Sequence, residues 1–232
     1  MADTIRTRPG YVAIGAMATH HAISRHTDLT GGHGVLREDA GKIAHPAIRA
    51  RGTIGGSICH ADPMADYPAV LVALGAEIEI ASNQGMRRVA AEAFFIDFLT
   101  TVLGPGEMVT RVHLPTAPTG SVVAYEKFAR ADGDFTTVSV ALTMAMDDMR
   151  CSSIGLALGS CGPTTIRSRE AEAVLFGSDF TPNIIADACQ ILGSATEPMD
   201  DVRGSASYRR TLIPRLVDRA ISQARAALLM RS

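Results

Sequence analysis

Short blocks of apolar residues, some alternating with polar residues and some at helical spacing, predict strands and helices in mixed order. In the first half, alternation predicts strands over residues 11–17, 77–81, 86–90 and 107–114. Spacing and capping residues predict helices over residues 19–25, 66–74 and 94–100, and one that ends near His45. Charged residues alternate with apolar ones through 77–81, which predicts an edge strand, and Asn83-Gln84-Gly85 is expected to form a turn.

A segment rich in turn residues, at positions 115–120, divides this pattern in two. We therefore predict one domain over residues 1–118 and a second over residues 121–232. In the second, the pattern predicts strands over 122–128, 136–146 and 153–159 and helices over 167–175, 181–192 and 205–230. The last helix has an apolar side, and we expect a solvated face for its arginines Arg209, Arg210, Arg215 and Arg219. The predicted fold class is α+β, ending in a small α/β domain with a three-stranded antiparallel sheet.

Composition narrows the classes of function. A net charge of -2 offers no basic surface for nucleic acid, so we expect no nucleic-acid partner. No apolar run is long enough to span a membrane, and residues 1–10 lack a signal-peptide layout, so a cytoplasmic protein is expected. The four cysteines form no Cys-x-x-Cys pair, and a metal site among the histidines His20, His21 and His26 is not expected. No arrangement of a nucleophile with a base stands out.

The most informative chemistry lies in residues 51–66. Gly55 and Gly56 have no Cβ, so the backbone can approach a ligand closely, and successive N–H groups in such a turn attract phosphate oxygens. Thr53 and Ser57 add hydroxyl donors, and the carboxylates Asp62 and Asp66 follow. An ordinary turn between two apolar elements is the alternative, and the segment is not a Gly-x-Gly-x-x-Gly fingerprint.

The segment from Pro46 to Ala69, with its Arg-Gly-Thr-Ile-Gly-Gly-Ser core, resembles the FAD-binding medium subunit of the molybdenum hydroxylases, the family of carbon monoxide and xanthine dehydrogenases. Further matches occur in the same order: Ile14-Gly-Ala-Met, Tyr125-Glu-Lys-Phe with Gly133-Asp-Phe-Thr, and Ser207-Tyr-Arg-Arg. Together they cover nearly the whole chain. The resemblance implies an FAD-binding domain of the PCMH type followed by the family's C-terminal domain.

The resemblance also implies site residues. The family's second FAD loop falls on Thr53, Ile54, Gly55, Gly56 and Ser57, and an FAD-contacting carboxylate falls on Asp66. Asp62 lies beside it, with helix capping as the alternative. Val109 falls in a strand that lines the cofactor, and Ile43 lies near it or in the ordinary core. Lys127 falls near the isoalloxazine ring, where a cation stabilises negative charge, or is a surface charge.

The chain departs from the family at its start. Members usually carry a further N-terminal segment with a first glycine-rich FAD loop, and here the sequence begins almost at Ile14-Gly-Ala. The Gly31-Gly32-His33-Gly34 run lies after that step, so we interpret it as a loop or helix break. We therefore expect an FAD-binding domain that lacks its N-terminal part and half of the usual cradle.

By resemblance, we expect an FAD-carrying electron-transfer subunit, without catalytic acid–base residues of its own. A large molybdopterin-containing subunit and a small subunit with [2Fe–2S] clusters are the expected partners, arranged as a dimer of heterotrimers. Electrons would pass from the clusters through FAD to an external acceptor. The alternative is a structural or assembly subunit that no longer binds FAD.

Overall fold

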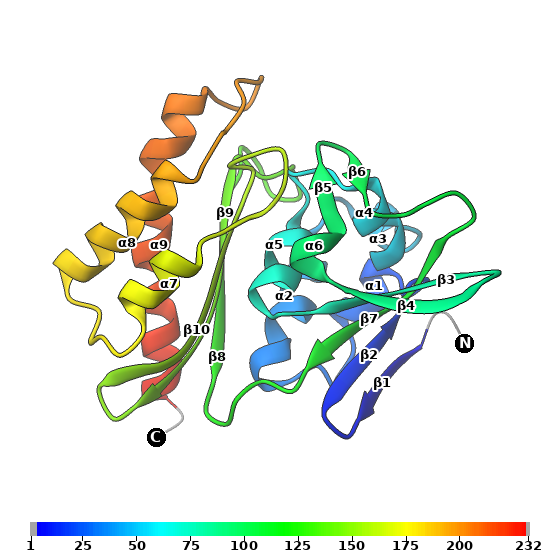
Figure 1. Ribbon diagram of the computed structural model, residues 1–232, viewed down its shortest axis with the longest axis horizontal. Coiled ribbons are helices and arrows are strands. Elements are labelled where there is room, and N and C mark those ends of the chain that lie inside the picture. The colour runs from blue at the N-terminus through cyan, green and yellow to red at the C-terminus, as the bar shows by residue number, and fades with distance from the viewer. Residues whose placement is uncertain (1–3, 231–232) are drawn as a thin grey trace.

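The structure is a computed structural model, and it describes residues 4–230. Two large antiparallel sheets, a small two-stranded one, and the helices between and beside them form the molecule (Figure 1). Strands β8–β10 stand in the middle, with the helices of the first half on one side and α7, α8 and α9 on the other. This mixture of helices and strands confirms the predicted α+β class.

The first sheet has five strands in the order β1-β2-β7-β3-β4. Their bounds are β1 Ile5–Arg8, β2 Tyr11–Gly15, β7 Met108–Pro115, β3 Glu77–Ser82 and β4 Gly85–Ala90. The prediction of an edge position for β3 is wrong, because β3 pairs with β7 on one side and with β4 on the other. Its charged residues alternate because one face of the sheet is turned away from the core, where Glu79 pairs with arginines of the neighbouring strands.

Short helices cover the inner face of this sheet. They are α1 His20–Ser24, the 3-10 turn η1 Gly31–His33, α2 Gly34–Lys42, α3 Pro46–Arg49, α4 Ile54–His60 and α5 Asp66–Ala73. Thr19 caps α1 by accepting a hydrogen bond from the Ala22 N–H, as predicted. The glycine-rich run at 31–34 forms η1 and the first residue of α2, so it opens a helix.

The predicted helix over 94–100 is wrong. The chain forms the short helix α6 Ala91–Phe94 and then a small hairpin of β5 Phe95–Asp97 and β6 Thr100–Thr101. The Asp97 carboxylate accepts a hydrogen bond from the Phe98 N–H, and Leu99 adopts a positive φ of 50°. Turn chemistry at the tip of the hairpin therefore overrides the helical spacing of its apolar residues.

The second sheet has the order β11-β10-β9-β8. Its strands are β8 Val122–Phe128, β9 Val138–Asp147, β10 Arg150–Gly159 and β11 Ile166–Arg167. The three long strands match the expected three-stranded sheet, and the two-residue β11 adds a fourth that is too short to leave a periodic signal. One face packs against α7 Arg169–Leu175, α8 Pro182–Ser194 and α9 Ala206–Leu229.

Helix α5 lies between the two sheets and packs against β9 and β10. All eight of its residues are buried, as expected for a helix that is apolar on every side beyond its first residue, Asp66. The face of the second sheet opposite α9 therefore packs on α5, and Tyr125, Ala141 and Ala157 belong to the core of the first half. Within residues 4–230, no helix is both long and apolar enough to cross a membrane.

Candidate functional site

The glycine turn begins at Thr53, which caps α4 by accepting a hydrogen bond from the Gly56 N–H at 3.1 Å. The Ile54 N–H donates to the Ala18 carbonyl at 3.0 Å, and the Gly55 N–H donates to the Ala16 carbonyl at 2.8 Å. These bonds join the start of α4 to the segment that follows β2. The N–H groups of the turn are thus bonded within the chain, and the Thr53 and Ser57 hydroxyls remain as donors.

The two glycines of the turn serve different purposes. A Cβ on Gly55 would lie 2.7 Å from the Ala16 carbonyl oxygen, so packing between α4 and the chain after β2 requires glycine there. Gly56 is exposed, and a Cβ on it would approach only the Thr53 hydroxyl, at 3.2 Å. Gly56 therefore leaves an open edge of backbone at the surface of the turn.

Asp66, the first residue of α5, is buried and accepts three hydrogen bonds from the second sheet and its neighbourhood. The Tyr125 hydroxyl donates at 2.7 Å, the Lys127 Nζ at 2.9 Å and the Thr136 hydroxyl at 3.0 Å. The Lys127 side chain is 13% exposed, so it forms a largely buried ion pair. This cluster connects the two halves of the chain.

A chain of buried polar groups leads from the glycine turn toward that cluster. The His20 N–H donates to the Gly52 carbonyl, and the His20 Nδ1 lies 2.9 Å from the Tyr67 hydroxyl. Tyr67 is fully buried and follows Asp66 directly on α5. The pKa of His20 is lowered overall. Burial is the largest cause, the Asp66 charge acts to raise the pKa, and the Arg49 charge lowers it further.

Asp39 of α2 lies in the same region and was missed at the sequence level. It is 1% exposed, and neither carboxylate oxygen has a hydrogen-bond partner within residues 4–230. Burial raises the pKa of Asp39 well above its usual value, and the charge of Asp66 raises it further. The charges of Lys127 and Lys42 act in the opposite direction but are smaller effects. Its spacing in the sequence could have revealed its burial, because Asp39 follows Val35 by four residues and so lies on the same, buried side of α2.

The other predicted residues lie around this centre. The Asp62 carboxylate accepts a hydrogen bond from the Met64 N–H at 2.8 Å, which closes a turn before α5. Val109 is 8% exposed on β7, which packs against α4. Ile43 is half-buried just after α2. The structure thus places Thr53–Ser57 with Val109 along α4, and Asp66 with Lys127 at the junction of the halves.

A groove of about 820 Å³ opens beside Lys127. It runs between the segment at 41–49, strand β8 with its following loop, and Arg219 and Gln223 of α9. Arg49 stiffens one wall by donating to the Ile43 and Ala44 carbonyls at 2.9 and 2.6 Å. Among the predicted site residues, Lys127 lines this groove, whereas the glycine turn lies outside its lining.

Comparison with known proteins identifies the family. The family model described as the FAD binding domain in molybdopterin dehydrogenase matches residues 2–117. The model of the CO dehydrogenase flavoprotein C-terminal domain matches residues 123–224. The medium chain of carbon monoxide dehydrogenase from Afipia carboxidovorans is 35% identical, over 96% of this chain and 77% of that protein. The alpha subunit of the 6-hydroxypseudooxynicotine dehydrogenase complex from Paenarthrobacter nicotinovorans is 35% identical, over 95% of this chain and 75% of that protein.

Solved structures of similar proteins support the same family assignment. A carbon monoxide dehydrogenase from Hydrogenophaga pseudoflava superimposes with a TM-score of 0.93 at 34% identity, over 97% of this chain and 78% of that one. Quinoline 2-oxidoreductase from Pseudomonas putida 86 gives a TM-score of 0.90 at 31% identity, over 97% of this chain and 78% of that one. The chain therefore belongs to the FAD-binding medium subunits of the molybdenum hydroxylases, which are oxidoreductases.

Proposed function

We propose that this chain holds FAD between its glycine turn and the Asp66–Lys127 pair and relays electrons to an external acceptor. Membership of the FAD-binding family, with both family domains matched, is the observation that carries the proposal. On this account Thr53, Ile54, Gly55, Gly56, Ser57, Asp62, Asp66, Val109 and Lys127 form this chain's part of the site.

The residues present suit such a cofactor. The pyrophosphate of FAD needs hydrogen-bond donors and a backbone it can approach, and Gly56 offers an open edge between the Thr53 and Ser57 hydroxyls. Thr53 accepts a bond from the Gly56 N–H and keeps its own hydrogen for donation. Gly55 contributes indirectly, because its close packing on Ala16 fixes the position of the turn.

Bound FAD supplies electron transfer in single steps and in pairs, and the protein supplies position and electrostatics. Lys127 provides a positive charge at the groove, and Asp66 holds the ammonium in place at 2.9 Å. Burial raises the pKa of Tyr125, as does the Asp66 charge, so its hydroxyl keeps the proton that it donates to Asp66. Asp39 adds no second negative charge while it is protonated.

The rest of the complex belongs to the same proposal. Relatives include the medium chain of carbon monoxide dehydrogenase and the medium subunit of nicotine 6-hydroxylase, names that imply larger and smaller companions. We propose a large subunit with the molybdenum cofactor and a small subunit that carries [2Fe–2S] clusters, as a dimer of heterotrimers. Electrons would enter from those clusters. A cytoplasmic location stays a prediction.

Titration of the purified chain with FAD, followed by flavin fluorescence, tests the cofactor assignment. Thr53→Ala removes both a hydroxyl donor and the cap of α4, and we expect FAD affinity to fall about tenfold. Ser168→Ala is the matched control, since Ser168 caps α7 in the same way by accepting from the Ala171 N–H. Equal affinities in the wild type and both variants would contradict the assignment, and a folded chain without FAD binding would favour the structural-subunit alternative.

A further inference from the structure

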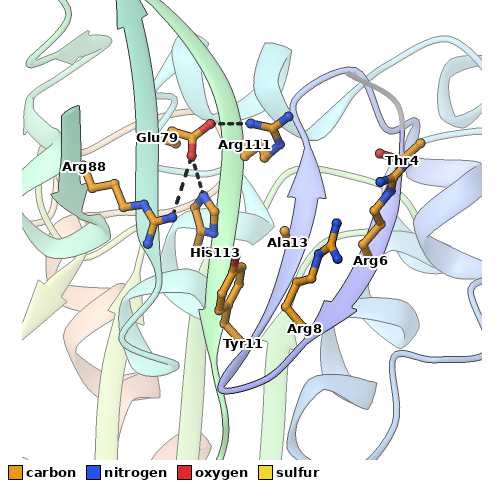
Figure 2. Close-up of a pocket in the computed structure, with 9 residues that line it drawn as sticks. All are labelled: Thr4, Arg6, Arg8, Tyr11, Ala13, Glu79, Arg88, Arg111 and His113. Atoms are coloured by element: carbon orange, nitrogen blue, oxygen red, sulfur yellow. Dashed lines mark hydrogen bonds and ion pairs between the residues drawn. The ribbon is translucent and has the colours of Figure 1, made fainter. Parts of the chain in front are cut away.

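A second concave site lies on the face of the first sheet that is turned away from the helices (Figure 2). Val12 and Ile14 of β2 point into the core, so the alternating Tyr11 and Ala13 point to the other face. A pocket of about 180 Å³ opens there, lined by Thr4, Arg6, Arg8, Tyr11, Ala13, Glu79, Arg88, Arg111 and His113. It is separate from the glycine turn and from the groove beside Lys127.

Strand register creates the hollow. Arg6 lies opposite Ala13, and Ala13 lies opposite His113 on the next strand. The short side chain of Ala13 therefore leaves a gap between the Arg6 guanidinium and the His113 imidazole, and Figure 2 shows it in this position. Arg8 lies opposite Tyr11, whose ring is 5.1 Å from the His113 ring and forms a wall.

Positive charge dominates this pocket. Arg111 is 2.7 Å from the Glu79 carboxylate, and Arg88 is 3.8 Å from it. Arg6 and Arg8 have no ion-pair partner among residues 4–230. Arg88 also lies 3.5 Å from the Glu77 carboxylate at the edge of this face. Glu77 and Glu79 thus offset the charges of Arg88 and Arg111, whereas nothing described on this face offsets the charges of Arg6 and Arg8 on β1.

His113 supplies an independent observation. It is 4% exposed, and its Nε2 is 3.0 Å from Glu79, whereas its Nδ1 is buried with no hydrogen-bond partner in the described chain. Burial acts to raise the pKa of Glu79, but hydrogen bonds from Thr110, Arg111 and His113 lower it to about 2. Glu79 is thus a carboxylate that accepts the Nε2–H. The unpartnered Nδ1 of that tautomer is an acceptor, which a water or the hydroxyl of a monoprotonated phosphate can satisfy.

We propose that this pocket binds the phosphate group of a small molecule or of free phosphate. Guanidinium groups match phosphate in bidentate geometry, and Arg6 and Arg8 are available for it. Glu79 faces the same pocket and disfavours an anion beside it, but it also holds Arg111 and His113 in position. The volume accommodates a phosphate with several waters or with a small organic group against Tyr11.

Calorimetric titration of the full chain at constant ionic strength tests this inference, with inorganic phosphate and glycerol 3-phosphate as the ligands. We expect saturable binding that weakens at least about tenfold in the Arg6→Gln/Arg8→Gln double variant. The matched control is Arg25→Gln/Arg215→Gln, which removes the same charge from exposed arginines elsewhere. Ala13→Leu fills the hollow without any change of charge and is also expected to weaken binding.

Absence of saturable binding, or equal weakening in the two double variants, would overturn the proposal, because the second result indicates a general charge effect. Equal affinity for both ligands identifies the bare anion as sufficient. Tighter binding of glycerol 3-phosphate identifies a phosphomonoester site. In either case the NMR signals of the His113 imidazole should shift on titration, whereas those of the exposed His21 should not.

Discussion

At the scale of single residues, the glycines around the turn fix the candidate FAD site by distinct contacts. A Cβ on Gly52 would lie 2.7 Å from the His20 imidazole, and one on Gly55 would lie as close to the Ala16 carbonyl. Gly56 meets no such barrier. The sequence pattern predicted that these residues form a close turn, but it offered no means to separate glycines that pack from one that leaves space for a ligand.

A pair of alanine substitutions separates these roles. Gly55→Ala is expected to lower the free energy of unfolding by about 2 kcal/mol, because the new methyl group collides with rigid backbone. Gly56→Ala is expected to change it by less than about 1 kcal/mol and to weaken FAD binding. Urea unfolding measures both, and similar destabilisation by the two substitutions would contradict the assigned contacts.

The buried carboxyl group of Asp39 predicts a dependence of stability on pH. Its pKa is raised in the folded state, so its contribution to stability is largest at low pH and is lost as pH rises through the folded pKa. Asp39→Asn removes this titration. As pH increases from the usual pKa of an aspartate upward, the free energy of unfolding of the wild type should therefore fall relative to that of the variant. Urea unfolding across this range checks it, and a constant difference would contradict the raised pKa.

At the scale of elements, local sequence patterns predicted whether a strand or helix exists better than they predicted its position in the sheet or its exposure to solvent. The strand expected over 122–128 is β8 with the same bounds, because its alternation is regular and turns flank it. The edge position expected for β3 is wrong because strand order depends on pairing with the distant β7. The solvated face expected for the arginines of α9 is wrong at Arg209, which is 2% exposed.

Arg209 fastens α9 to the second sheet. Its guanidinium donates to the Thr137 carbonyl and to Asp201, the latter at 2.5 Å. Arg209→Met leaves Asp201 without this partner, and we expect the free energy of unfolding to fall by about 3 kcal/mol. Arg215→Met, at an exposed position of the same helix, should change it by less than about 0.5 kcal/mol. Thermal unfolding compares them, and equal midpoints would refute the role of Arg209.

At the scale of the whole molecule, the two halves are joined through a buried centre. The hydrogen bonds of Asp66 reach residues 59, 61 and 70 positions away along the chain, and α5 lies between the sheets. Such long-range contacts leave no local periodic signal, so the sequence predicted two domains but not the contacts that join them. The site residues came from the family resemblance, whereas Asp39, Tyr125 and Thr136 required the folded geometry.

This connection predicts coupled unfolding. Lys127→Met leaves the Asp66 charge buried without its cation, and we expect a loss of about 3 kcal/mol in the free energy of unfolding. Asp66→Asn combined with Lys127→Met should recover part of it, because neither charge remains. Far-UV and near-UV circular dichroism should report one shared transition in the wild type, and two separate transitions would contradict a common centre.

The flavin content of the protein is the measurement that tests the FAD assignment first. We would record the visible absorption spectrum of the purified chain before and after addition of FAD, remove unbound cofactor, and quantify released FAD by chromatography. We expect flavin absorption bands with an equimolar amount of FAD, reduced in Gly56→Ala but unchanged in Gly193→Ala, where an added Cβ meets open space. A chain that is folded by circular dichroism but retains no FAD would show that these residues do not hold the cofactor.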